Sequence, residues 1–410
     1  MFSYSPHSPT PDEFAELVAE SMINHGSASG QLVFDRRGFA LLVKGPQGQA
    51  NKQIYLNNFY RDYCLSDGQK REEILLRAST VDDEPVNTTD ANKKCLVAHI
   101  QDRWSAEKLR LASLKLGVPS TPLGRRSSAP YMVLADHFAI SVSHESDNPL
   151  VDFTASVIDD ASLDDAVASA TENLRRKPPL QFESVIQGDS DEQILHASIS
   201  SETDHIARIL QAKQIESLTV PGKHLIFLIN QGYILVTGTS SEQGLMYAYS
   251  QLRPAQTQPR PLPPIPILLE RGRYSRYRIP RESLWHFFFR EMELRYLCNI
   301  CKSQQEILQS KFSHLIQGNQ LADFELARDD DGKLFSYCAV TERMPALIPK
   351  TDCVYFQNRN GRAASASLKR LFEDWPGLFQ ETDFYPPRYL MTQFPDTAQL
   401  AKIGHDARFE

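Results

Sequence analysis

The residues of this sequence with the clearest chemical potential are Cys298 and Cys301, which form a CxxC pair. Thiolates at that spacing can join a zinc tetrahedron or form a redox pair, and Cys338 and Cys353 could complete four ligands through the tertiary fold. The pair also lies on one seam of an expected helix, because steps of four and three residues return to the same face. That seam is formed by Leu294, Cys298, Cys301, Leu308, Phe312 and Leu315, with Gln305 as its polar member. We therefore expect both cysteines to pack as small hydrophobic side chains, without a metal.

The run TGTSS at residues 237–241 stands between an expected strand and an expected helix, where backbone N–H groups can bind a phosphate. It lacks the lysine of a Walker loop and the GxGxxG spacing of a dinucleotide-binding loop. Ser240 with Gln243, or Thr239 with Glu242, would instead form a capping box. We expect these residues to cap the helix that follows.

The acidic run at Asp329, Asp330 and Asp331 precedes Gly332. An EF-hand loop would need further ligands and a glutamate at its twelfth position, so we expect a hairpin turn here. No GxSxG, HExxH or kinase-like motif occurs in the sequence, and the 11 histidines are scattered without metal-ligand spacing. The sequence therefore predicts no catalytic residues, no metal site and no cofactor.

The segment RGRYSRYRIPR at residues 271–281 has five arginines and no acid, against an acidic background. An arginine can form a fork of hydrogen bonds to phosphate while a tyrosine stacks on a base. In an extended segment Arg276 and Arg278 would project together, and Arg271 and Arg273 would form a second pair. The candidate anion- or nucleic-acid-binding residues are Arg271, Arg273, Tyr274, Arg276, Tyr277 and Arg278. The alternative is an edge strand or linker whose arginines pair with acids of a neighbouring unit.

The composition is that of a folded protein, with 41% hydrophobic and 23% charged residues. A net charge of -7, from 44 basic and 51 acidic residues, argues against a protein that coats nucleic acid by bulk charge. The six cysteines do not suggest a disulfide framework, and no secretory leader is recognisable. No apolar run approaches the roughly 18 residues of a membrane span. We expect a cytoplasmic protein that does not engage a membrane.

The spacing of apolar residues predicts an α+β fold, with several small mixed units of antiparallel hairpins and packed helices. Helices are expected at residues 10–24 with Thr10 as cap, at 59–75, from Leu96 through Leu116, and at 162–176, 240–252, 281–316 and 363–372. Strands are expected at 31–35, 39–45, 53–57, 131–143, 153–158, in two strands after Phe182, and at 224–230, 233–238, 323–340 and 353–357. The last forty or so residues are expected to be irregular, and no role is predicted for residues 358–410.

Six of the fourteen residues from 253 to 266 are proline, which predicts a stiff, extended connector. The expected organisation is an N-terminal α+β unit at 1–177, a second α+β unit at 178–252, the connector at 253–266, and a C-terminal α+β unit at 267–410. The C-terminal unit would contain the long helix and the irregular tail.

Several local stretches are similar to a known family. They are GFALLVKG with IYLNNFYRDYC, then YILVTGTSSEQGL, and then DGKLFSYCAV followed by IPKTDCVYF. In their order, over about residues 10–357, they resemble the uncharacterised bacterial proteins typified by YtpQ, a family defined by a domain of unknown function. The resemblance implies an α+β fold in a bacterial cytoplasm and supplies no catalytic residues.

The sequence favours a non-enzymatic binding or adaptor protein with another protein as its partner, because small α/β units leave sheet faces and edges suited to recognition. One alternative is a nucleic-acid-associated protein that uses residues 271–281. Another is an enzyme whose site is assembled from residues far apart in the sequence. Salt-dependent binding to oligonucleotides would favour the first alternative, and a deep pocket with convergent polar groups the second.

Overall fold

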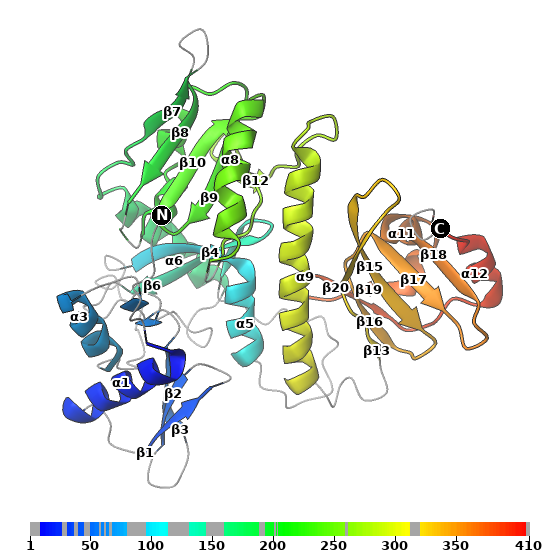
Figure 1. Ribbon diagram of the computed structural model, residues 1–410, viewed down its shortest axis with the longest axis horizontal. Helices are drawn as coiled ribbons and strands as arrows, with labels where there is room; N and C mark the ends of the chain where they lie inside the picture. Colours follow the sequence, from blue (N-terminus) through cyan, green and yellow to red (C-terminus); the bar gives the residue numbers. More distant parts are fainter. Residues whose placement is uncertain are drawn as a thin grey trace. The chain divides into compact units, whose positions relative to one another are not determined.

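A computed structural model of the chain divides into two compact units, residues 1–97 with 143–153 and residues 98–142 with 154–410 (Figure 1). The structure describes residues 9–26, 31–36, 40–44, 50–56, 59–60, 63–64, 68–79, 96–113, 131–144, 160–187, 193–200, 202, 204–258, 261–311 and 320–406. Helices combine with several small antiparallel and mixed sheets, which confirms the predicted α+β class.

The first unit packs two helices against an antiparallel sheet in the order β1-β2-β3. Its elements are α1 (Pro11–Asn24), β1 (Gln31–Asp35), β2 (Ala40–Lys44), β3 (Ala50–Tyr55) and α3 (Gly68–Ser79). Thr10 caps α1 as predicted, and with Glu13 it forms a capping box, because each side chain bonds the backbone N–H of the other residue. Phe14, Val18 and Met22 of α1 form one core with the sheet.

The second unit contains a six-stranded antiparallel sheet in the order β12-β11-β9-β10-β8-β7. The strands are β7 (Glu183–Gln187), β8 (Gln193–Ile199), β9 (His224–Asn230), β10 (Tyr233–Gly238), β11 (Ile267–Glu270) and β12 (Arg273–Arg276). The short helices η1 (Ile206–Leu210) and α7 (Ala212–Glu216) connect β8 to β9, and α8 (Glu242–Ala255) packs across the sheet (Figure 1). The order of β7, β8, β9, β10 and α8 agrees with the sequence prediction.

The proline-rich residues 253–266 do not separate two units as expected. β11 follows this segment and β9 precedes it, yet the two strands pair, with Ile267 opposite Ile226. Arg253 and Pro254 belong to the last turn of α8, and Leu262 and Ile265 are buried among the prolines. The apolar residues of the segment therefore fix it to the sheet, and the boundaries expected at 177, 252 and 266 are replaced by those of the two compact units.

A three-stranded sheet in the order β4-β6-β5 also belongs largely to the second unit. Its strands are β4 (Leu96–Asp102), β5 (Met132–Ala135) and β6 (Phe138–His144), with helices α5 (Arg103–Ser113) and α6 (Asp160–Leu174) nearby in the chain. The helix predicted from Leu96 is wrong over its first seven residues. LVAHIQD alternates buried and half-buried positions, which is the period of a strand, and the helix begins at Arg103. The strand expected at 153–158 lies outside the described residues.

The long helix α9 (His286–Lys311) leads to two four-stranded sheets, β13-β16-β20-β19 and β14-β15-β17-β18. Their strands are β13 (Gln320–Leu321), β14 (Glu325–Arg328), β15 (Leu334–Thr341), β16 (Ala346–Pro349), β17 (Cys353–Gln357), β18 (Ala363–Ser367), β19 (Phe379–Glu381) and β20 (Arg388–Met391). The helical segments are α11 (Leu368–Asp374), η2 (Pro376–Leu378) and α12 (Thr397–Ile403).

Two expectations for this C-terminal part are wrong. Residues 363–367 form a strand paired with β17, and the helix starts only at Leu368, where the Ser367 hydroxyl accepts the Arg370 N–H. The tail is not irregular, since β20 pairs with β16 and α12 packs against the same core. Short strands of small or mixed residues are weak signals in a sequence, and here tertiary pairing determines them.

Candidate functional site

The predicted arginine segment begins at the turn between β11 and β12. Arg271 and Gly272 form this two-residue turn with φ angles of 51° and 70°, which is the backbone conformation of a primed hairpin turn. β12 is the outermost strand of the six-stranded sheet. The segment therefore has the edge-strand position that the alternative interpretation required.

Arg276 is paired with acids inside the second unit. Its Nη1 lies 2.7 Å from Oδ2 of Asp136, and its Nη2 lies 2.6 Å from Oε1 of Glu293. Its side chain is only 20% exposed. Arg276 therefore joins β12 to the β5–β6 turn and to α9.

The two tyrosines of the segment also contact the fold. The Tyr274 hydroxyl donates to the carbonyl oxygen of Ile209, and burial raises the pKa of Tyr274. Tyr277 packs against the core beneath α8, and burial raises its pKa as well. Neither ring stands free as a stacking platform.

The side chains of Arg271, Arg273 and Arg278 are exposed and make no hydrogen bond or ion pair within the described residues. Along β12 the more exposed positions are Arg273 and Ser275, whereas Arg276 shares the less exposed face with Tyr274. Arg276 therefore does not project together with Arg278 as a pair of anion-binding side chains, as the sequence predicted. The structure separates the predicted site residues into three free arginines and three side chains that stabilise the fold.

A buried polar network continues from Arg276 through α9. The Nε2 atom of His137 lies 3.4 Å from Oε1 of Glu293, and its Nδ1 lies 2.6 Å from the hydroxyl of Tyr385. The hydroxyls of Tyr385 and Tyr296 are also hydrogen-bonded, and Tyr296 donates to the carboxylate of Asp102. The network connects the end of β4, the β5–β6 turn, α9 and the segment between β19 and β20.

The two buried acids of this network have opposite pKa shifts. Burial raises the pKa of Glu293, but the hydrogen bond with His137 and the charges of Arg276, His137 and Arg290 lower it more, to about 2. Burial raises the pKa of Asp102 more than the hydrogen bond from Tyr296 lowers it. Glu293 therefore gains from being charged in the folded protein, whereas Asp102 does not.

A carboxylate, a histidine and a tyrosine in series are groups that acid–base catalysis can use. Here His137 and Tyr385 are 4% and 1% exposed, so no substrate reaches them in this structure. The network instead connects, through buried hydrogen bonds, segments that are far apart in the sequence, and so stabilises the fold. The sequence analysis missed it, although Asp136 and His137 stand between the apolar runs YMVLA and FAISV, which is an unusual place for charge.

An exposed aromatic cluster lies where the arginine segment reaches α9. The ring of Tyr249 from α8 lies 5.6 Å from that of Trp285 and 5.4 Å from that of Phe288, measured between centroids. Phe288 is 44% exposed and Leu284 is 81% exposed, and Met246, one turn before Tyr249, is 49% exposed. The sequence analysis considered the run LWHFFF only as too short for a membrane span, so this cluster was missed.

Three arginines lie close to this cluster in the chain. Arg253 follows Tyr249 by four residues and so shares its face of α8, while Arg278 and Arg281 precede Leu284 in the chain. The side chains of all three are exposed and form no hydrogen bond or ion pair in the described part of the chain. We call this region the arginine–aromatic surface. It consists of Met246, Tyr249, Arg253, Arg278, Arg281, Leu284, Trp285 and Phe288.

The other sequence motifs contribute to the fold. Cys298 and Cys301 are buried on α9 beside Leu294 and Phe324, as predicted, and burial raises the pKa of the Cys301 thiol to about 12. Among the described residues no group of three or more His, Cys, Asp or Glu side chains could hold a metal ion.

The turn before α8 satisfies its own backbone donors. The N–H groups of Thr239, Ser240 and Ser241 donate to the carbonyl oxygens of residues 223, 221 and 238. The Ser241 hydroxyl accepts the Gly244 N–H at 2.9 Å, so the helix is capped by Ser241 and not by the predicted pairs starting at Thr239 or Ser240. These three N–H groups are thus not available to a phosphate.

The acidic run forms the predicted hairpin turn between β14 and β15. The Gly332 N–H donates to the Asp329 carbonyl, and the Asp329 carboxylate accepts the Lys333 N–H. Separately, no helix in the described ranges has the length and apolar character needed to cross a bilayer.

Comparisons with known proteins return nothing. No family model, no curated protein and no solved structure matches this chain. The resemblance to the YtpQ-like proteins therefore stays a prediction.

Proposed function

We propose that this chain is a non-enzymatic binding protein of the bacterial cytoplasm that docks a protein partner on its arginine–aromatic surface. The observation that supports this most directly is the exposure of Leu284 and Phe288 beside Trp285 and Tyr249. A cluster of exposed apolar side chains, in contrast to single exposed residues, is typical of interaction sites.

The residue types suit the centre of a protein interface. Tryptophan, tyrosine and arginine dominate the energetically important positions of measured interfaces. Covering a leucine as exposed as Leu284 contributes on the order of 1.5–3 kcal/mol through the hydrophobic effect. Contacts among Tyr249, Trp285 and Phe288 hold the rings in place before binding, so little side-chain freedom remains to be lost.

The charges indicate the chemistry of the partner. Arg253, Arg278 and Arg281 are free, whereas the acids close by in the chain are Glu242, which accepts a hydrogen bond from Ser283, and Glu282. This local excess of positive charge in a chain of net charge -7 favours a partner with acidic groups around an apolar anchor.

The five cysteines of the described part are buried and form no disulfide, which suits a reducing compartment. The buried network around His137 contains the groups closest to catalytic chemistry, and its members are shielded from solvent. Both observations support a cytoplasmic binding role over an enzymatic one.

The experiment places a photo-crosslinking amino acid at position 284 and, as a matched control, at Ile199, which is 72% exposed in the same unit. Both proteins are irradiated in cells, and the products are identified by mass spectrometry. A protein that crosslinks at 284 but not at 199 is then purified, and its affinity is measured against the wild type and against Leu284→Asp and Phe288→Asp. We expect a weakening of about tenfold or more for each change.

Equal crosslinking at both positions, or unchanged affinity in both variants, contradicts the proposed surface. The exposed Arg271, Arg273 and Arg278 leave nucleic acid as an outcome of the same experiment. If nucleic acid is recovered, and its affinity falls with salt along a slope that Arg271→Ala, Arg273→Ala and Arg278→Ala together reduce, the partner is a nucleic acid and the proposal of a protein partner is wrong.

A further inference from the structure

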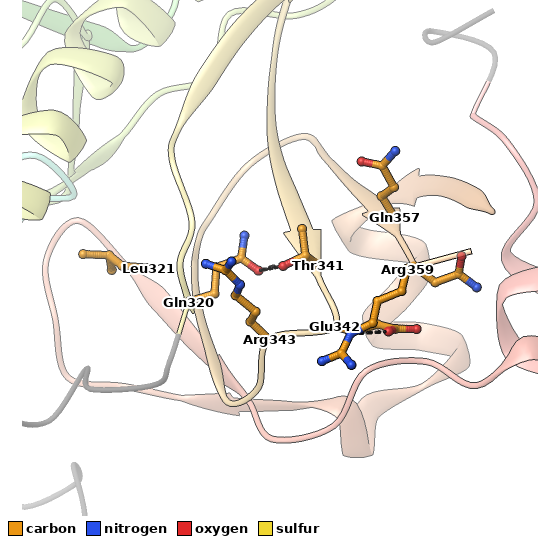
Figure 2. Close-up of a pocket in the computed structure, with 8 residues that line it drawn as sticks. Gln320, Leu321, Thr341, Glu342, Arg343, Gln357 and Arg359 are labelled. Atoms are coloured by element: carbon orange, nitrogen blue, oxygen red, sulfur yellow. Dashed lines mark hydrogen bonds and ion pairs between the residues drawn. The ribbon is translucent and has the colours of Figure 1, made fainter. Parts of the chain in front are cut away.

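A pocket of about 740 Å³ opens in the C-terminal part of the second unit, far along the chain from the arginine–aromatic surface (Figure 2). It is lined by Gln320, Leu321, Thr341, Glu342, Arg343, Gln357, Asn358 and Arg359. Its volume lies within the range usual for small-molecule sites.

Strand topology explains why polar side chains gather there. β15 and β17 are parallel, and their last residues, Thr341 and Gln357, are direct partners. The loops that follow β15 and β17 therefore lie at the same edge of the sheet. Ligands of open sheets commonly bind outside the carboxyl ends of parallel strands, because loops with free polar groups converge there.

Hydrogen bonds fix the framework of the pocket. The Gln320 side chain donates to the Ala339 carbonyl at 2.9 Å and accepts the Thr341 N–H at 2.8 Å. In the second loop the side-chain oxygen Oδ1 of Asn358 accepts the backbone N–H groups of Asn360 and Arg362. Both sides of the pocket are thus held before any ligand arrives.

The positive charge in the pocket is not balanced. Arg359 Nε lies 3.3 Å from Oε2 of Glu342, whereas Arg343 forms no hydrogen bond or ion pair with any described residue. Figure 2 shows Arg343 reaching back from its loop toward Gln320, and Arg359 turned toward Glu342. The lining thus contains two guanidinium groups and one carboxylate, and this net positive charge favours an anion.

We propose that this pocket binds a sugar phosphate. The phosphoryl group accepts hydrogen bonds from Arg343 and from the free donors of Arg359, as paired guanidinium groups favour. The Gln357 amide, with no partner among the described residues, and the acceptor Glu342 bind sugar hydroxyls. The lining contains no aromatic ring on which a nucleobase could stack, which favours a sugar over a nucleotide.

Isothermal titration of the full chain with glucose 6-phosphate, ribose 5-phosphate, glycerol 3-phosphate, adenosine 5′-monophosphate, inorganic phosphate and glucose tests the proposal. We expect at least one of the first three to bind more tightly than adenosine monophosphate and inorganic phosphate, and glucose to bind least. Arg343→Gln should weaken that binding by about tenfold or more. Arg362→Gln is the matched control, since Arg362 is exposed in the neighbouring β17–β18 loop, which also contains Arg359, but does not line the pocket.

The proposal is overturned if none of the three phosphorylated compounds binds the wild-type chain. It is also overturned if inorganic phosphate or adenosine monophosphate binds as tightly as they do, or if both variants lose affinity equally. Circular dichroism of Arg343→Gln identifies a folding defect, in which case Gln357→Ala serves as the second variant with the same expected loss.

Discussion

The buried network around Arg276 and the arginine–aromatic surface depart from the usual distribution of side chains in opposite ways. Arg276 and Glu293 are charged groups taken largely out of water, whereas Leu284 and Phe288 are apolar groups left in it. Phe288 and Glu293 are only five residues apart on α9. The buried charges find their partners within the chain. The exposed apolar side chains have too few contacts within the chain. We therefore expect a partner to bind at the arginine–aromatic surface.

The largest effect should come from comparing two arginines of the same strand. Arg276→Ala leaves Glu293 as a buried carboxylate without its closest cation, and should lower the free energy of unfolding of the second unit by about 3 kcal/mol. Arg273→Ala removes an exposed, unpaired side chain and should change it by about 0.5 kcal/mol or less. Urea denaturation followed by far-UV circular dichroism measures both values. Equal effects of the two changes would show that Arg276 is not part of a stabilising network.

The next effect is on the pH dependence of stability. The pKa of Glu293 is about 2 in the folded protein, against an ordinary value of 4.5. A carboxyl with a lowered pKa stabilises the fold above its unfolded pKa, and this contribution disappears as the pH falls from 4.5 to about 2. At neutral pH it amounts to at most about 3 kcal/mol. The stability gap between wild type and Glu293→Gln should therefore be wide at pH 7 and close between pH 4.5 and 2. Glu172→Gln, which removes an exposed pair with Arg175, is the control. A gap that stays constant with pH would contradict the assignment.

Asp102 should behave in the opposite way. Because burial raises its pKa in the fold, the ionised carboxylate is disfavoured there, and lowering the pH relieves this penalty. Asp102→Asn keeps an oxygen that can accept from Tyr296 and Trp104. We expect it to be neutral or stabilising by up to about 1 kcal/mol at pH 7. As the pH falls, the free energy of unfolding of the wild type should rise relative to that of this variant. A loss of several kcal/mol would show that the charge of Asp102, and not only its oxygen, holds the network together.

Local signals explain what the sequence predicted well. The capping box at Thr10, the hairpin turn at Asp329 and the burial of Cys298 and Cys301 each depend on residues within one or two turns of chain. β4 was missed in part because its partner β6 lies far away in sequence, so pairing outweighed local preference. β18 pairs with β17 just before it, but its small residues, AASAS, are a weak strand signal.

The sites were harder to predict for the same reason. Arg276 and Arg273 are each followed by a tyrosine and stand in the same basic run, and only the fold brings Arg276 to Asp136, 140 residues away. The aromatic run at 285–289 was visible, but which rings stay exposed depends on how α8 packs beside α9. The pocket likewise requires two parallel strands whose pairing has no signature in the sequence.

The smallest effect on stability should come from Leu284→Ser. Replacing a leucine by serine usually destabilises a protein, because most leucines are buried, but Leu284 is exposed. Leu284 is 81% exposed, so replacing it removes few contacts and should change the free energy of unfolding by about 0.5 kcal/mol or less. Leu245 of α8, which is 2% exposed, is the matched control, and Leu245→Ser should lower stability by about 3 kcal/mol or more. Both are read from the same urea transition. If Leu284→Ser destabilises as strongly as Leu245→Ser, the chain itself covers Leu284 in solution, and the arginine–aromatic surface is part of the core. If Leu284→Ser leaves stability unchanged and the crosslinked partner is lost, the leucine is exposed for binding, since its apolar surface stabilises only the complex.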